Sequence, residues 1–219
     1  MVAAALLAGC GSSASDNGIA TKTPQEIVAE AKAAADGAAS VHMLFSGVSN
    51  GRPLSLDMEL LAGTGGHGRI TENGVGLEVI LLGGDIYING SPAFWRANGG
   101  EAAAQLFQGK WLKAAARSGS FASITSLTDL RKLIDKALTD HAALSAAGTT
   151  TINGQRAVAV RDVNGGVIYV AVMGKPFPIE LTKRAGGVAT IVFDRWNQAV
   201  TVASPPNAIN INQLRTGHP

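Results

Sequence analysis

Leu54-Ser55-Leu56-Asp57-Met58-Glu59-Leu60 alternates strictly between apolar and polar side chains. Successive side chains of a β-strand point to opposite faces of a sheet, so this alternation predicts a strand with one buried and one solvated face. Four further strands are expected around it, at 40–46, 68–72, 75–82 and 85–89. Asn-Gly turns at 50–51 and 73–74 and a glycine-rich loop at 63–68 separate them. This half of the chain is therefore predicted to form an antiparallel meander.

A second meander is expected after Thr149, opened by a third Asn-Gly turn at 153–154. Its strands are predicted at 155–162, 166–173, 178–183, 188–193 and 199–203. Between the two meanders, 91–100 is expected to be a loop, and 110–113 either a short strand or an exposed turn.

Thr23-Pro24-Gln25-Glu26 predicts the start of a helix that runs to Asp36. Thr23 can cap the first turn, proline suits the first helical position, and Glu26 stands where a capping box places its acid. A short helix is expected at 101–107, and apolar residues at helical spacing predict an amphipathic helix at 126–138.

Runs of strands with helices inserted between them predict an α+β fold. Because a large sheet twists and curls, we expect a curved antiparallel sheet, an open half-barrel of about ten strands, with two to three helices packed on its concave side. The expected organisation is a signal segment at 1–9, a tether at 10–22, one folded domain at 23–206 and a loose tail at 207–219.

The composition and the motifs argue against several classes of function. The formal net charge of +2 is too small to indicate a nucleic-acid partner. The four histidines, His42, His67, His141 and His218, lack the spacing of a metal site. The sequence holds neither a Gly-x-Ser-x-Gly elbow nor a phosphate-binding loop. We therefore expect no enzymatic activity, no cofactor and no metal.

Leu7-Ala8-Gly9-Cys10 ends a short apolar run and holds the chain's single cysteine. A polar, small-residue stretch follows at 11–18. This pattern is typical of a lipoprotein signal peptide, in which Cys10 becomes the acylated N-terminus. No Lys or Arg precedes Cys10, so the signal peptide at 1–9 is incomplete. The alternative is a frayed N-terminus with a chance cysteine.

Residues 75–82 and 167–173, in two of the expected strands, are apolar on both faces for much of their length. Either they are central strands covered on both sides, or they line an apolar cavity between sheet and helices. Such a cavity can hold acyl chains, because burial stabilises by about 0.8 kcal/mol per CH₂. The candidate lining residues are Leu54, Leu56, Met58, Leu60, Val75, Leu77, Val79, Leu81, Val167 and Tyr169.

Three aromatic residues, Phe94, Trp95 and Trp111, flank the helical insertions near the expected rim of the sheet. Amphipathic aromatic rings suit the edge of an apolar site, so the three are candidates for the rim of the pocket. The alternative is a small satellite core.

The order of these elements resembles the mycobacterial LprG/LppX-type lipoproteins, which share the LolA/LolB-like fold. The matching stretches are 7–10, 40–43, 85–90, 110–111, 151–155 and 205–206. The resemblance implies a curved sheet over helices, with 23–206 as a LolA-like lipid-binding domain around an apolar pocket.

The resemblance also implies a function. It indicates a monomer, anchored through an acylated, palmitate-bearing Cys10 on the extracytoplasmic face of the cell membrane. Such a protein binds or carries a lipid, an acylated glycolipid or another apolar ligand in the cell envelope. The alternative is an anchored scaffold or interaction module with a filled core and no small ligand.

Overall fold

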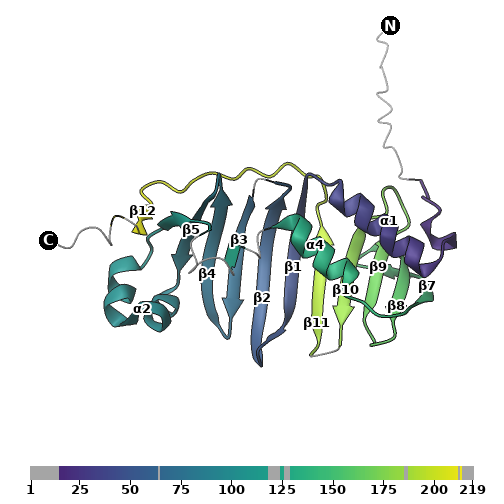
Figure 1. Cartoon of the computed structure of the whole chain (residues 1–219), viewed down its shortest axis with the longest axis horizontal. Helices are drawn as coiled ribbons and strands as arrows, with labels where there is room; N and C mark the ends of the chain where they lie inside the picture. Colours follow the sequence, from purple (N-terminus) through teal and green to yellow (C-terminus); the bar gives the residue numbers. More distant parts are fainter. Residues whose placement is uncertain are drawn as a thin grey trace, which may run out of the picture.

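The computed structural model describes residues 15–63, 65–117, 124–125, 129–184, 187–211 and 213. Twelve strands in this part of the chain form one sheet in the order β12-β6-β5-β4-β3-β2-β1-β11-β10-β9-β8-β7 (Figure 1). The first six are β1 (Ser40–Ser49), β2 (Arg52–Leu61), β3 (Gly65–Glu72), β4 (Val75–Leu82), β5 (Asp85–Gly90) and β6 (Leu112–Ala115). The others are β7 (Leu144–Ile152), β8 (Gln155–Asp162), β9 (Val167–Ala171), β10 (Pro178–Lys183), β11 (Ala189–Asp194) and β12 (Ile209–Asn210).

β1 joins the two meanders, because it pairs with β2 on one side and with β11 on the other. The pairs between named strands are antiparallel except for β12 with β6. The sheet begins at β12 and ends at β7, so it is open. The predicted class, an α+β fold with an open antiparallel sheet, is confirmed, with twelve strands where about ten were expected.

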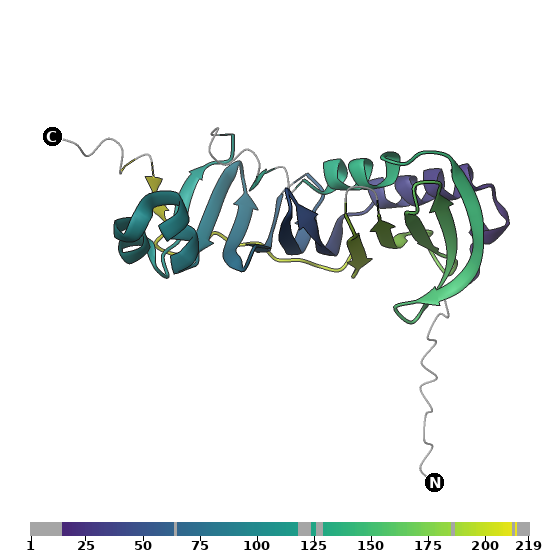
Figure 2. The ribbon, with the colours of Figure 1, turned by 90° about the horizontal axis from the view of Figure 1, so that it is seen from below.

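Three α-helices of the described chain lie on one face of the sheet: α1 (Pro24–Asp36), α2 (Pro92–Phe107) and α4 (Leu130–Thr139). α1 contacts α4 and strands β7 to β10, and Figure 2 shows α1 and α4 running along the same side of the sheet. α2 contacts β4 and β5 in the other half of the molecule (Figure 1). None of the described helices is long and apolar enough to cross a membrane.

The start of α1 is confirmed in detail. The Thr23 hydroxyl accepts from the Glu26 N–H, the Glu26 carboxylate accepts from the Thr23 N–H at 2.9 Å, and Pro24 is the first helical residue. α4 begins at Leu130, where the Asp129 side chain accepts from the Lys132 N–H. Of the helix expected at 126–138, residues 126–128 lie outside the described part of the chain.

The main core fills the space between this face of the sheet and the helices. Alternate residues of successive strands meet there, as the pairing of Met43 with Met58 and with Phe193 shows. Ile27, Ile134 and other apolar residues of the helices cover them. A much smaller cluster of Ala157, Ala171 and Ile179 lies apart from the main core and includes the half-buried Tyr169 at its edge.

The glycine-rich segment expected to be a loop belongs largely to a strand, since β3 begins at Gly65. A Cβ atom on Gly68 would lie 2.1 Å from the Asp57 carbonyl oxygen and 2.7 Å from the Met58 sulfur. β2 therefore leans over β3, and the glycines are required for close approach of two strands rather than for a loop.

The prediction of a loop at 91–100 is also wrong, because α2 begins at Pro92. Ser91 caps it, with its hydroxyl accepting from the Phe94 N–H at 3.2 Å. The helix is interrupted at Gly100, whose φ of 78° and ψ of −174° are not helical. Glycine has a low helix propensity, so the Gly99-Gly100 pair obscures the helical pattern of the sequence although the helix continues on both sides of the break.

Two further strand predictions differ from the structure. Residues 144–148 belong to β7 although the strand period was expected to return only after Thr149, and a register shift at Ala146/Thr149 explains the broken alternation. Residues 199–203 form no strand.

Residues 195–208 instead form a crossing segment that links β11 to β12 past the ends of β1 to β5 (Figure 1). Its start is fixed by hydrogen bonds from the Asn197 N–H to the Ser40 carbonyl (3.0 Å) and from the Ser40 hydroxyl to the Gln198 carbonyl (2.6 Å). At its end, Ile209 and Asn210 pair with β6, so this part of the expected loose tail is held by the sheet.

The expected tether is also shorter than 10–22. Asp16 forms a bridge with Met173, and Asn17 donates from its backbone to the Val172 carbonyl (3.0 Å) and from its side chain to the Ala171 carbonyl (2.9 Å). Ile19 is fully buried in the main core. The chain is therefore attached to the fold from Asp16 onward, while Cys10 and residues 1–9 lie outside the described residues.

Candidate functional site

A cavity of about 970 Å³ lies between α2 and the turn ends of β1 to β4. Leu54, Ile70 and Leu77 come from three neighbouring strands and belong to the helix-covered face, where Ile70 is paired with Leu77. The apolar residues of its wall are Leu54, Ile70, Val75, Leu77, Phe94, Trp95, Ala97 and Ile124. The cavity is therefore continuous with the main core.

Gly90 lets the aromatic residues of α2 approach the sheet. A Cβ atom on Gly90 would lie 2.3 Å from Phe94 Cδ1 and 3.0 Å from Trp95 Cε2. The Trp95 ring lies edge-on to Phe94, with ring centroids 4.9 Å apart, and 5.3 Å from the Phe107 ring. These contacts bury Trp95 to 8% exposure and fix one wall of the cavity.

Polar side chains line the same cavity beside the apolar ones. They are Ser49, Asn50, Arg52, Glu72, Asn73 and Asn98. Asn50 and Asn73 occupy the two Asn-Gly turns, with φ of 50° and 48°, so each turn places an exposed amide at the cavity. A space with apolar walls and amide, hydroxyl and charged groups around it suits a molecule with an apolar chain and a polar end.

The structure brings together only part of the predicted lining. Leu54, Val75 and Leu77 line the cavity. Leu56, Met58, Leu60 and Val79 are buried in the main core, the last three at 0% exposure. Leu81 lines a separate hollow of about 480 Å³ beside the start of α4.

Val167 and Tyr169 are on the opposite face of the sheet from the cavity. Ile168, between them, pairs with Leu181 and Val160 in the main core, which turns its two neighbours away. Tyr169 packs at the edge of the smaller cluster. The prediction for these two residues was wrong because an all-apolar strand does not show which face is inward.

The predicted rim is divided in the same way. Phe94 and Trp95 line the cavity, Trp95 as a buried wall rather than an exposed rim. Trp111 lines a different hollow, of about 490 Å³, together with His67 and Ile80. Register places it on the other face, because Lys113, two residues on, pairs with Tyr87, which pairs with Ile80.

Sequence reasoning missed Ile70, Ala97, Asn98 and Ile124. Ile70 was recoverable, since it lies in an expected strand directly across an Asn-Gly turn from Leu77. Asn98 and Ala97 lie in the segment taken for a loop, so the helix that brings them to the cavity was not expected.

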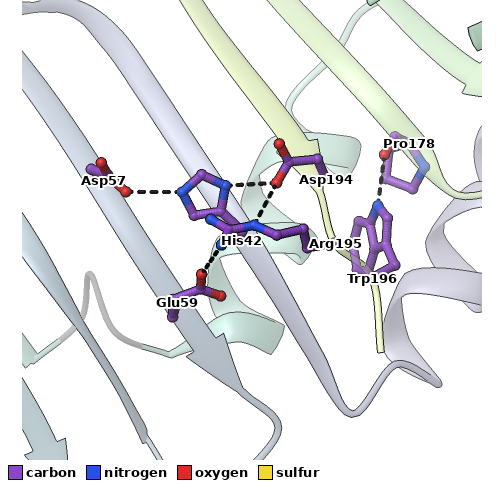
Figure 3. A network of polar contacts seen from close by, with 7 residues as sticks. All are labelled: His42, Asp57, Glu59, Pro178, Asp194, Arg195 and Trp196. Atoms are coloured by element: carbon purple, nitrogen blue, oxygen red, sulfur yellow. Dashed lines mark hydrogen bonds and ion pairs between the residues drawn. The ribbon is translucent and has the colours of Figure 1, made fainter. Parts of the chain in front are cut away.

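A buried histidine lies on the face of the sheet opposite the cavity. His42, 8% exposed, has its Nδ1 2.6 Å from an Asp194 oxygen and its Nε2 2.9 Å from an Asp57 oxygen (Figure 3). An imidazolium ring donates to both carboxylates, whereas a neutral ring donates from one nitrogen only. Beside it, Arg195 pairs with Glu59 at 2.8 Å. This network joins β1, β2 and the end of β11.

The network contains no nucleophile beside a base. Its hydrogen bonds and ion pair connect β1 to β2 and to the end of β11. The described residues include no group of three His, Cys, Asp or Glu side chains that could hold a metal ion. His42 lies in β1, and its ring is held between Asp57 of β2 and Asp194 of β11.

No protein-family model and no curated protein matches the chain by sequence. Solved structures match it by fold. The crystal structure of LprF from Mycobacterium bovis aligns with a TM-score of 0.59 and 14% identity, over 83% of this chain and 96% of that one. The Mycobacterium tuberculosis lipoprotein LppX aligns with a TM-score of 0.55 and 16% identity, over 82% of this chain and 99% of that one. The chain therefore has the fold of these two mycobacterial proteins, as its resemblance to the LprG/LppX type implied.

Proposed function

We propose that the cavity between α2 and the sheet binds the apolar part of a lipid, an acylated glycolipid or another apolar ligand. The observation that carries this proposal is the cavity itself, with its aliphatic and aromatic walls and adjoining polar groups. Its volume of about 970 Å³ is at the upper end of the range of small-molecule sites. The shared fold with a lipoprotein, LppX, supports the proposal.

Burial of the ligand supplies the binding energy. Each CH₂ group moved from water into such a space contributes about 0.8 kcal/mol. An apolar space without an occupant loses packing contacts, so an open cavity in a protein of this size favours a ligand over a scaffold with a filled core.

The proposal extends to the location of the protein. A lipoprotein acylated at Cys10 is held at the extracytoplasmic face of the cell membrane, where a monomer collects or delivers its lipid. A single acyl chain anchors only marginally, so durable attachment needs the two or more chains that an acylated N-terminal cysteine carries. The domain over 23–206 binds the ligand in this scheme, and the protein acts without catalysis.

Binding is tested by filling the cavity. Val75→Trp places an indole in the space, whereas Val79→Trp, on the same strand and fully buried, overpacks the core. We expect Val75→Trp to lose at least tenfold in affinity for a fluorescent fatty acid such as cis-parinaric acid, with little change in stability. The control should lose about 1–3 kcal/mol of unfolding free energy.

Fluorescence titration and urea unfolding of both variants give the two readouts. If the wild-type protein binds no apolar probe, the proposed function is wrong. If Val75→Trp binds as well as the wild type, the ligand site lies elsewhere.

Anchoring is tested with Cys10→Ala in the full-length precursor. The variant should move from the membrane fraction to the soluble fraction, since it has no acceptor for the acyl chains. Metabolic labelling with a palmitate analogue provides the second measurement. An unchanged distribution would show that lipidation is not the anchor.

A further inference from the structure

Trp95 carries a hydrogen-bond donor that no described residue satisfies. Its Nε1 is buried and has no hydrogen-bond partner among the described residues, and the Trp95 side chain, 8% exposed, lines the cavity. An unsatisfied buried donor costs about 1–3 kcal/mol, and native structures rarely keep one without a reason. The unsatisfied donor therefore marks a position where a partner is missing.

The indole of Trp196 shows the usual arrangement. Its Nε1 donates to the Pro178 carbonyl at 3.1 Å, as Figure 3 shows. Aromatic rings pack against both tryptophans: Trp196 stacks on Phe177 with ring centroids 4.7 Å apart, and Trp95 lies edge-on to Phe94 with centroids 4.9 Å apart. Aromatic packing alone thus does not explain the missing partner of Trp95.

The side chains packed against Trp95 offer its indole no acceptor, since Phe94 and Phe107 have none. The cavity wall does hold acceptor oxygens, but none of them bonds to the Trp95 Nε1; they belong to Ser49, Asn50, Glu72, Asn73 and Asn98. An acceptor for this donor can therefore be supplied by a molecule in the cavity.

We propose that Trp95 selects the ligand by donating its indole N–H to a carbonyl oxygen of an acyl ester. This inference rests on the proposed function of the cavity. A carbonyl suits the position because it only accepts. Beside the buried indole, which is packed against the Phe94 and Phe107 rings, a hydroxyl would bring a donor that needs its own partner, and a carboxylate would bring a charge. Each would cost free energy.

The aromatic rings around Trp95 must shift slightly for a carbonyl to reach the indole nitrogen, because this atom is inaccessible to water and contacts no acceptor of the described residues. The contacts that move are ring contacts with Phe94 and Phe107. They contain no hydrogen bond that must be broken. Trp95 is a specificity-determining residue in this arrangement.

Nuclear magnetic resonance of the indole N–H groups tests the inference in the wild-type protein. The chain has three tryptophans, Trp95, Trp111 and Trp196, which single Trp→Phe variants assign. The probes are methyl laurate and pentadecane, which have the same number of non-hydrogen atoms. Methyl laurate should shift the Trp95 indole proton downfield and pentadecane should not. Trp196, already bonded, and Trp111, on the other face, are internal controls.

Affinity gives the second readout. The ratio of the two dissociation constants should favour methyl laurate about three- to tenfold more in the wild type than in Trp95→Phe, since one net hydrogen bond is lost. If both probes bind and the Trp95 proton and this ratio do not distinguish them, the inference is wrong while the proposed function stands. If neither probe binds, both fail. The wild-type spectra remain decisive if Trp95→Phe does not fold, because the other two variants assign Trp95 by elimination.

Discussion

At the scale of single residues, glycine decides how closely the strands approach. Gly66 and Gly68 of β3 leave room for the chain and side chains of β2, and Gly90 leaves room for the aromatic rings of α2. The sequence shows the glycines but not the neighbours that exclude a Cβ atom. For this reason, 63–68 was predicted to be a loop.

Gly68→Ala should destabilise the fold by about 1–3 kcal/mol, because its Cβ would lie 2.1 Å from the Asp57 carbonyl oxygen. Gly76→Ala, on the neighbouring strand, is the matched control, since the nearest atom to its Cβ would be 3.6 Å away. Urea unfolding measures both. Equal stability of the two variants would contradict the close approach of β2 to β3.

At the scale of elements, the start of α1 was predictable because its signals are local. A capping box needs only Thr23, Pro24 and Glu26 in sequence. The Thr23 hydroxyl and backbone hold the pKa of the Glu26 carboxyl below its usual range. In contrast, the first half of α2 was not predicted, because glycines interrupt its helical pattern. The strands that are apolar on both faces do not show in the sequence which face points to the core.

Thr23→Ala should cost about 1 kcal/mol of unfolding free energy at neutral pH, because it removes the N-cap. The Glu26 pKa is lower in the folded chain than in the unfolded chain. Its contribution is therefore complete above the ordinary value of 4.5 and disappears as the pH falls through the lower folded value. The difference between the variant and the wild type should shrink accordingly in acid.

Chemical unfolding at a series of pH values measures this effect. Thr23→Ser is the control, since serine keeps the capping hydroxyl and should remain close to the wild type. A loss of stability in Thr23→Ala that is the same at every pH would contradict the contribution of Glu26.

At the scale of the whole molecule, β1 is the seam between the two meanders. Sequence patterns predicted the meanders well, because each is built from neighbours along the chain. They gave no sign that β1 pairs with β11 across 152 residues between His42 and Asp194, nor that 195–208 crosses the sheet. The predicted lining is placed only in part: Leu54, Val75 and Leu77, from the first meander, lie at the cavity, whereas Val167 and Tyr169, from an all-apolar strand of the second, lie on the opposite face.

His42→Leu should weaken this seam, with a loss of about 1–3 kcal/mol, because the Asp57 and Asp194 carboxylates lose a shared donor. Asp57→Asn should cost less, since Asp57 is 68% exposed and Asp194 keeps its bond to the ring. Thermal unfolding and amide hydrogen exchange of β1 and β11 measure both variants. A larger effect from Asp57→Asn would contradict this order.

Attachment of the chain to the fold from Asp16 onward would limit how a molecule acylated at Cys10 is oriented at a membrane. Five residues lie between Cys10 and Asp16, and the six steps of extended chain from one to the other reach at most about 20 Å. Asp16 is fastened next to β9, six strand positions from β4, which is about 30 Å along the sheet. If acylated Cys10 holds this end of the sheet close to the bilayer, the cavity reaches the bilayer only when the sheet lies along the membrane surface. The long axis of the sheet would then run parallel to the membrane plane.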